Sequence, residues 1–363
     1  MKTQNVRNIL VPIDFSKMSI QAIETAKRLA QRFGATVHLA HVRQFYYSAG
    51  FTAPMPSVVP FSVVTNDQEA EKTTSRQLNA LAAKHGLSRA TCHLLSGAPA
   101  FDEICRLAQE IPADLIVMPT HGHAGLKHVL LGSTAERIVQ HSPCPVLVTR
   151  GAPHGIHKIL VPVDFSSCSL EGLKYAIEFT GRVAKVIVFH AVYPGYAYTA
   201  DGYAMCDFTV VTDALRKDAE RQMREFLRAA RFRSVKFEAV TRVGPPVDEI
   251  CAFAQAEDVD LIITATHGRT GFKHVLIGSI AERVVRHAPC AVLVVPSHPG
   301  VRALAVKSSK VGRKKSVRHS SKTRPLEEEP EETAQLTRRS RKLKAHAFPE
   351  RRKTNRFREW RSS

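Results

Sequence analysis

The sequence predicts an α/β fold in which one domain occurs twice, each copy an open parallel sheet of five strands with helices on both faces. The first observation is a repeat: residues 120–133 return at 266–279 with a constant offset of 146. The second is alternation, because short apolar runs alternate with longer segments of helical periodicity in both copies. Strands and helices in this order form βαβ units, and such units build a doubly wound sheet.

The first copy opens with an apolar run at residues 8–14, NILVPID, which ends in Asp14. A continuous apolar run of this length suits a strand buried on both faces of a parallel sheet. Residues 16–33 then place apolar side chains near helical spacing. Residues 36–42 are the second predicted strand, so Asp14 and Val42 both stand at carboxyl ends of strands.

The remaining elements of the first copy continue the alternation. Residues 43–65 are rich in aromatic residues and proline without a clear period, which predicts a long loop that could cover a pocket. The predicted helices span residues 66–85 and 99–109, and the predicted strands span residues 91–95, 114–118 and 145–149.

The repeated stretch joins the fourth strand to a helix and carries glycines and a serine at fixed places. Glycine lets the backbone come close to a ligand, and the N–H groups at the start of a helix attract anions. The pattern therefore predicts a phosphate site, unless the glycines only form turns and the serine only caps its helix; identity at 17 of 25 positions favours the phosphate site. The residues are Gly122, Gly125, Gly132 and Ser133 in the first copy and Gly268, Gly271, Gly278 and Ser279 in the second.

These residues should meet others at one crevice. In an open parallel sheet, ligands bind outside the carboxyl ends of the strands, where the strand order reverses. Asp14, Val42 and the loop at Gly122 all follow such ends. Three segments that are far apart in the sequence are therefore expected to converge.

The second copy repeats these features. Residues 158–166 match residues 8–16 at seven of nine positions, which makes Asp164 the counterpart of Asp14. The second strand of this copy is predicted to end at Val192. The predicted organisation is one domain at 1–150, a second at 156–297 and a tail at 298–363.

Four short motifs together resemble the universal stress protein family. They are I-L-V-P-x-D-F-S at the start of each copy, T-H-G-x-x-G in the loop, L-x-G-S-x-A-E-R at the helix and P-C-x-V-L-V at the end. The resemblance covers about residues 1–150 and 158–297. It implies an adenine-nucleotide alpha-hydrolase-like fold and, as in many members, binding of ATP with or without Mg²⁺.

The resemblance also implies roles for particular residues. Asp14 or Asp164 would contact the nucleoside, and Val42 or Val192 would contact the base through its backbone. The ATP-binding pattern G-x-x-G, nine residues, G-[ST] falls on Gly122, Gly132 and Ser133 in the first copy and on Gly268, Gly278 and Ser279 in the second; Gly125 and Gly271 lie in the same loops.

One position departs from the family pattern. Pro119 and Ala265 stand where the pattern has its first glycine. Proline lacks an N–H and its ring hinders close approach of a ligand, whereas alanine adds only a methyl group. A charge-assisted hydrogen bond is worth roughly 1.5–3 kcal/mol. If the backbone N–H of Ala265 contacts ATP, we therefore expect the second site to bind ATP at least about ten-fold more tightly than the first.

The predicted function is adenine-nucleotide binding in a cytoplasmic stress response, regulatory or protective and without catalytic residues. The alternatives are a slow ATPase and a polyanion-binding adaptor whose nucleotide sites have decayed. The sequence has no P-loop and no G-x-S-x-G elbow, and no apolar run reaches the roughly 18 residues that span a bilayer. Of His121, His123 and His128, the second copy keeps only two, so no metal site is expected.

Cysteines, tail and last strands complete the expectations. The seven cysteines include matched positions beside apolar residues and predict buried thiols rather than disulfides. Residues 300–363 hold 20 Lys and Arg against 7 Asp and Glu, which predicts disorder and either attraction to nucleic acid or anionic lipid or a solubilising role without a partner. Apolar strand edges at 146–148 and 292–294 should pair, within one chain or in a homodimer.

Overall fold

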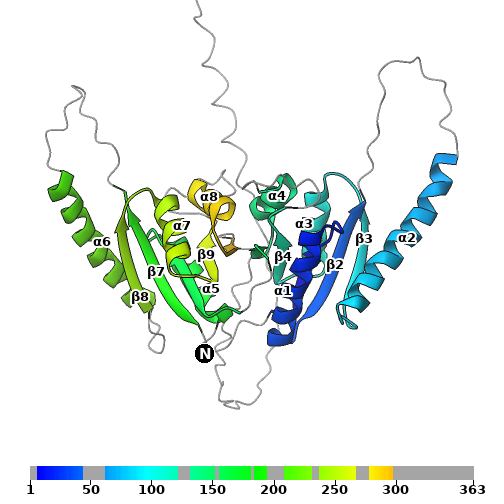
Figure 1. The fold of residues 1–363 in the computed structure, drawn as a ribbon, viewed down its shortest axis with the longest axis horizontal. Helices are drawn as coiled ribbons and strands as arrows, with labels where there is room; N and C mark the ends of the chain where they lie inside the picture. Colours follow the sequence, from blue (N-terminus) through cyan, green and yellow to red (C-terminus); the bar gives the residue numbers. More distant parts are fainter. Residues whose placement is uncertain are drawn as a thin grey trace, which may run out of the picture. The chain divides into compact units, whose positions relative to one another are not determined.

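The computed structural model describes both copies of the repeat (Figure 1). The glycines at 122, 125, 268 and 271, most of the predicted loop at 43–65, and the tail lie outside the described residues. All the described residues belong to one compact unit, Met1–Ala305. The described ranges are 6–43, 62–121, 131–151, 155–180, 184–193, 208–230, 237–266 and 278–296, with side chains of the two longest helices described from 68 and from 212.

The first half alternates strands and helices as predicted. Its first strand ends earlier than the apolar run, so that Asp14 lies two residues beyond it. The elements are β1 (Asn8–Pro12), α1 (Lys17–Phe33), β2 (Thr36–Arg43), α2 (Ser62–Lys84), β3 (Thr91–Ser96), α3 (Ala100–Glu110), β4 (Leu115–Pro119), α4 (Ser133–His141) and β5 (Val146–Thr149).

The second half repeats this order. The elements are β6 (Lys158–Pro162), α5 (Ser167–Thr180), β7 (Lys185–Val192), α6 (Phe208–Ala230), β8 (Phe237–Val243), α7 (Pro246–Ala256), β9 (Leu261–Ala265), α8 (Ser279–His287) and β10 (Ala291–Val295).

The strands form one sheet of ten, in the order β3-β2-β1-β4-β5-β10-β9-β6-β7-β8. All pairs within a half are parallel, and the strand order reverses beside β1 and β6, as in a doubly wound sheet. The α/β fold with parallel sheets is therefore confirmed. Between the halves, β5 and β10 pair antiparallel, with Leu147 opposite Leu293.

Helices cover both faces of this sheet. On one face α1 and α2 pack Ile23 and Leu78 against strand residues such as Leu39. On the other, α3 and α4 pack Ile104 and Ile138. Every residue of β5 and β10 is buried, which explains their continuous apolar sequence.

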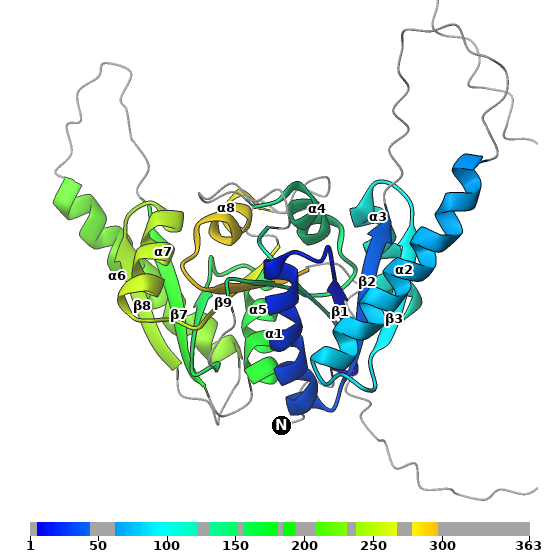
Figure 2. The same ribbon diagram turned by 45° about the vertical axis from the view of Figure 1, so that its right-hand side comes forward.

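Side chains add to the contact between the halves. Figures 1 and 2 show α4 beside α8, and α1 beside α5. The rings of Phe33 and Phe179 lie 5.4 Å apart. Arg150, which follows β5, donates from Nη2 to the carbonyls of Val285 and Arg286 at the end of α8, at 3.0 and 2.6 Å. Basic side chains stabilise the carbonyl end of a helix.

Candidate functional site

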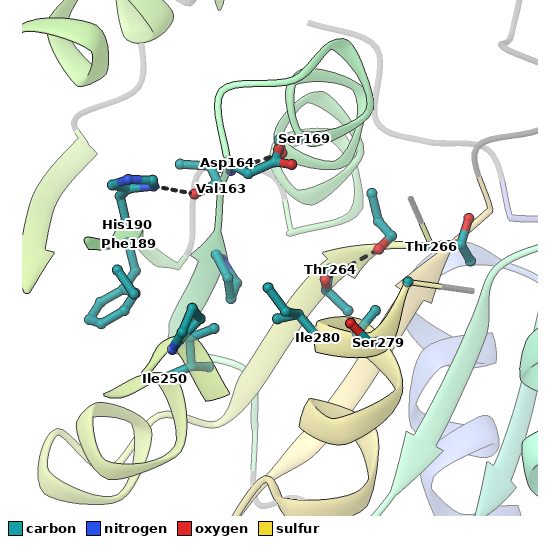
Figure 3. Close-up of a pocket in the computed structure, with 16 residues that line it drawn as sticks. Val163, Asp164, Ser169, Phe189, His190, Ile250, Thr264, Thr266, Ser279 and Ile280 are labelled. Carbon is teal, nitrogen blue, oxygen red and sulfur yellow. Dashed lines mark hydrogen bonds between the residues drawn. The ribbon is translucent and has the colours of Figure 1, made fainter. Parts of the chain in front are cut away.

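Each half has a cavity at the carboxyl ends of its strands, beside the start of α4 or α8. The first, of about 440 Å³, is lined by Asp14, Val42, Gly132 and Ser133, so four sequence-predicted residues meet there. The second, of about 280 Å³, is lined by Asp164, Gly278 and Ser279. Figure 3 shows the second cavity.

A tight turn after β1 and after β6 holds the aspartate of each cavity. Phe15 and Phe165 adopt left-handed backbone conformations, with φ of 62° and 63°. Such a conformation is costly for a bulky residue and is often found at functional sites. In the first half, the carboxylate of Asp14 accepts a hydrogen bond from the backbone N–H of Ser16 at 3.0 Å.

The second aspartate has additional hydroxyl donors. Asp164 accepts from the backbone N–H of Ser166 at 3.1 Å and from its Oγ at 2.6 Å, and also from Ser169 Oγ. The turn thus directs a carboxylate to each cavity and hydrogen-bonds it through the start of the next helix.

The other end of each cavity is the start of a helix. Gly132 and Gly278 are the N-cap residues of α4 and α8. Glycine has no side chain to cap the first N–H groups, so these stay available to an anion. A methyl group added at Gly132 would lie 3.4 Å from Thr120 O, and one at Gly278 would lie 3.3 Å from Thr266 O. Glycine therefore relieves crowding at this point of the loop.

Sequence analysis missed a histidine in each cavity. His41 and His190 line the two cavities, and their Nδ1 atoms lie 2.7 Å from the carbonyl oxygens of Ile13 and Val163. A carbonyl can only accept, so Nδ1 carries a proton in both rings. The available signal was the recurrence of a histidine at the same register position of β2 and β7.

His121 also lines the first cavity, although its sequence signal was only its place in the repeated loop. Its Nδ1 lies 2.9 Å from Thr120 Oγ1, and its buried Nε2 has no hydrogen-bond partner among the residues that the structure describes. Burial, and then the charge of Arg150, lower the pKa of His121. The lowered pKa favours the neutral imidazole, which leaves one buried ring nitrogen without a partner among the described residues.

The predicted base contact of the second half moves by one residue. Pro12 pairs with Ala40, and Pro162 pairs with Phe189, so the counterpart of Val42 is Ala191. Ala191 lines the second cavity, while Val192 is not among its lining residues. The reason is that the whole segment between β6 and β7 is one residue shorter than the segment between β1 and β2, so the offset between the copies changes between the first strand and the second.

The described cysteines do not supply a nucleophile to these cavities, since none of them lines either one. The six described cysteines are free thiols. Burial raises the pKa of Cys105 to about 11 and the pKa values of Cys144 and Cys290 to about 12. Protonated thiols are poor nucleophiles.

Comparison with known proteins places these observations in a family. A model of the universal stress protein family matches residues 5–150 and 155–296, so both halves match it separately. The chain belongs to the universal stress protein family. Its two cavities therefore lie in two universal stress protein domains that follow one another in a single chain.

Some relatives match most of the chain, and others match a stretch about as long as one copy of the repeat. A universal stress protein of Mycolicibacterium smegmatis is 25% identical over 293 residues, covering 79% of this chain and 96% of that protein. One of Methanocaldococcus jannaschii is 33% identical over 152 residues, covering 41% of this chain and 86% of that protein. The crystal structure of a universal stress protein from Archaeoglobus fulgidus is similar in fold, with a TM-score of 0.54 at 19% identity, and covers 81% of this chain and 100% of that one.

Within the described ranges, no group of three or more His, Cys, Asp and Glu side chains could hold a metal ion. No helix in the same part of the chain is long and apolar enough to cross a membrane.

Proposed function

We propose that this universal stress protein binds an adenine nucleotide at its cavities and acts in a regulatory or protective role rather than by turnover. The observation that carries the proposal is the first cavity, where the uncapped start of α4 faces the same space as the carboxylate of Asp14. One end thus suits phosphates, and the other suits a neutral group that can donate hydrogen bonds.

The phosphates would lie at the helix start. The backbone N–H groups after Gly132 and the positive end of the α4 dipole attract an anion, and the Ser133 hydroxyl can donate to it. In the second half Gly278 and Ser279 would have these roles. The loop glycines Gly122, Gly125, Gly268 and Gly271 remain proposed contacts outside the described residues.

The nucleoside would lie at the far end of the cavity. Asp14 is suited to accept hydrogen bonds from ribose hydroxyls, and Val42 offers backbone groups to the edge of a base. The imidazole of His121 also lines the first cavity and could donate or accept one hydrogen bond there, depending on its tautomer. Asp164 and Ala191 stand at the corresponding places of the second cavity, where Ala191 replaces Val192 as the proposed contact.

Slow hydrolysis is a second candidate, because one residue favours it. His121 lines the same cavity as Ser133 and keeps a nitrogen without a partner among the described side chains, as a general base requires. We expect phosphate release from ATP to be negligible, because Asp14 is proposed to hold the nucleoside rather than to act at the phosphates. Phosphate release by the wild type that is lost in His121→Gln would favour the ATPase instead.

Two partners complete the proposal. We infer that the halves associate in solution through β5 and β10, as a pair within one chain or as part of a homodimer.

The tail, with its excess of Lys and Arg, is proposed to bind nucleic acid or anionic lipid. Deleting residues 300–363 should abolish salt-sensitive retention on heparin; equal retention of the shortened chain would remove the polyanion role.

The nucleotide proposal is tested by calorimetric titration of the full chain with ATP, ADP and GTP, with Mg²⁺ and with EDTA. We expect binding of adenine nucleotides, and its loss in Gly132→Asp/Gly278→Asp, because each new carboxylate repels phosphate at a helix start. Unchanged ATP binding by this double variant, or none by the wild type, contradicts the proposal.

A further inference from the structure

The two cavities differ most at the end away from the helix start. The strand register makes Ala40 of β2 and Phe189 of β7 equivalent, since they pair with Pro12 and Pro162. Both residues line their cavities. Side chains alternate along a strand, so each lies on the same face as the residue two places on, Val42 or Ala191. A methyl group in one half is thus replaced by a phenyl ring in the other.

The ring of Phe189 is enclosed on the side away from the cavity. The side chain is fully buried, and its ring lies 5.2 Å from that of Phe253, tilted by 46°. The guanidinium of Arg242 lies over Phe253, 5.0 Å from the ring centre. The first half has Leu107 at the place of Phe253, with no ring pair. Phe189 is therefore held in place rather than free to move aside.

The position of the ring bears on which part of a ligand it meets. Figure 3 shows Phe189 and His190 on the opposite side of the second cavity from Ser279. A nucleotide with its phosphates at Ser279 would extend its nucleoside toward Phe189. In the first half the same path from Ser133 ends at Ala40.

The volumes agree with this difference. The first cavity holds about 440 Å³ and the second about 280 Å³. Cavities that bind small molecules and cofactors typically hold roughly 300–1,000 Å³, so the first lies within this range and the second just below it. At the rim of the second cavity, Ile280 replaces Thr134 and is 45% exposed, which removes a hydroxyl from the helix start.

We propose that the residue at this position selects the ligand, so that the first cavity is the adenine-nucleotide site and Phe189 excludes the nucleoside from the second. The inference rests on the proposed function and assigns it to one half. From Pro119 and Ala265, the second site is expected to bind ATP more tightly. Exclusion by Phe189 reverses that order, because a hydrogen bond from the N–H of Ala265 cannot strengthen ATP binding when the nucleoside is unable to enter the cavity.

The test uses the full chain with one site blocked at a time. Ser133→Asp and Ser279→Asp each place a carboxylate in the first turn of a helix, where it favours the helix but repels phosphate. Each blocked chain is titrated with ATP and with tripolyphosphate, which has the phosphates without the nucleoside. We expect Ser279→Asp to keep the ATP affinity of the wild type and Ser133→Asp to lose at least about ten-fold, or roughly 1.4 kcal/mol.

Substitutions at the selecting position then exchange the behaviour of the two sites. In the Ser133→Asp chain, Phe189→Ala should raise ATP affinity by at least about ten-fold and leave tripolyphosphate affinity unchanged. In the Ser279→Asp chain, Ala40→Phe should lower ATP affinity to a similar extent, and Ala40→Leu serves if the larger side chain prevents folding. The control is Val188→Ala, which removes a buried side chain from β7 on the opposite face and should leave both affinities unchanged.

The outcomes separate two failures. If the blocked chains bind ATP equally, or if neither Phe189→Ala nor Ala40→Leu changes ATP affinity, the assignment to Phe189 is wrong and nucleotide binding stands. If no folded chain, wild type included, binds ATP, the proposed function fails and the assignment fails with it.

Discussion

The two halves of this universal stress protein are nearly identical at one end of the cavity and different at the other. Gly132 and Ser133 recur as Gly278 and Ser279, each at the uncapped start of a helix. At the far end, however, Ala40 is replaced by Phe189. The comparison teaches that the two copies share the glycine and serine at the helix start but differ at the other end of the cavity, so two matching motifs need not mean two equal sites.

A second difference lies at the opposite ends of the strands. His38 and His93 in the first half face one another, with Nδ1 of His38 3.1 Å from Nε2 of His93. The register places Ile187 and Val240 at their positions in the second half. A polar, titratable pair thus stands in one half where the other has aliphatic side chains.

The largest expected effect is on stability and comes from the ring of Phe189, at the end of the second cavity away from the helix start. Phe189→Ala removes a fully buried ring from its contact with Phe253, and such changes cost about 3–5 kcal/mol. Ala40→Gly, the matched change in the first half, should cost about 1 kcal/mol or less. Urea unfolding of both variants measures this. Similar losses for the two would mean that the ring is not tightly packed.

The next effect concerns the junction, where the residue after the last strand is Arg150 in the first half and Pro296 in the second. Arg150→Met keeps an apolar stem but removes two hydrogen bonds to carbonyls at the end of α8, and bonds from a charged donor are worth about 1.5–3 kcal/mol. Arg286→Met removes a partly exposed ion pair with Glu136 and should cost at most about 1 kcal/mol. Urea unfolding measures both losses. A larger loss of unfolding free energy in Arg286→Met than in Arg150→Met would contradict the role given to Arg150 at the junction.

A smaller effect is a pH dependence confined to the first half. Burial, and then the nearby His93, lower the pKa of His38; burial also lowers the pKa of His93, while Glu110 opposes this. The unfolded chain therefore takes up protons before the folded one, and stability should fall as the pH drops through about 6.5. His38→Ile/His93→Val, which copies the second half, should weaken the dependence between pH 7.5 and 5.5. The measurement is the difference between the urea midpoints at pH 7.5 and pH 5.5. If this difference were the same in the variant as in the wild type, groups other than His38 and His93 would cause the pH dependence.

The smallest expected effect is that of the proline. In the Ser279→Asp chain, Pro119→Ala restores a backbone N–H beside the first cavity. Because the difference between the sites is assigned to Ala40 and Phe189 and not to this N–H, ATP binding should tighten by less than the roughly ten-fold that a charge-assisted hydrogen bond to phosphate would add. Calorimetry compares it with Ala40→Phe. If Pro119→Ala changed ATP affinity more than Ala40→Phe does, the backbone N–H at position 119, and not the side chain at position 40, would distinguish the two sites.

Much of the fold followed from local patterns. The repeat, the apolar runs and the family motifs predicted the parallel sheets. They also predicted that Asp14, Val42 and Ser133 would meet at one cavity, because each lies near the carboxyl end of a strand or at the start of a helix. The site predictions were least informative where packing decides. Phe189 looks like any apolar strand residue in the sequence, and only the sheet register shows that it is the equivalent of Ala40. The shift from Val192 to Ala191 has the same cause, since a shorter connection changes the register without changing the motif.

The most direct test of the unequal sites is to count nucleotides on the intact chain by native mass spectrometry during a titration with ATP. The account predicts that one nucleotide binds per chain before any second one, that Ser133→Asp removes this first nucleotide, and that Ser279→Asp retains it. Two nucleotides binding together, or a first nucleotide that disappears in Ser279→Asp and persists in Ser133→Asp, would contradict it.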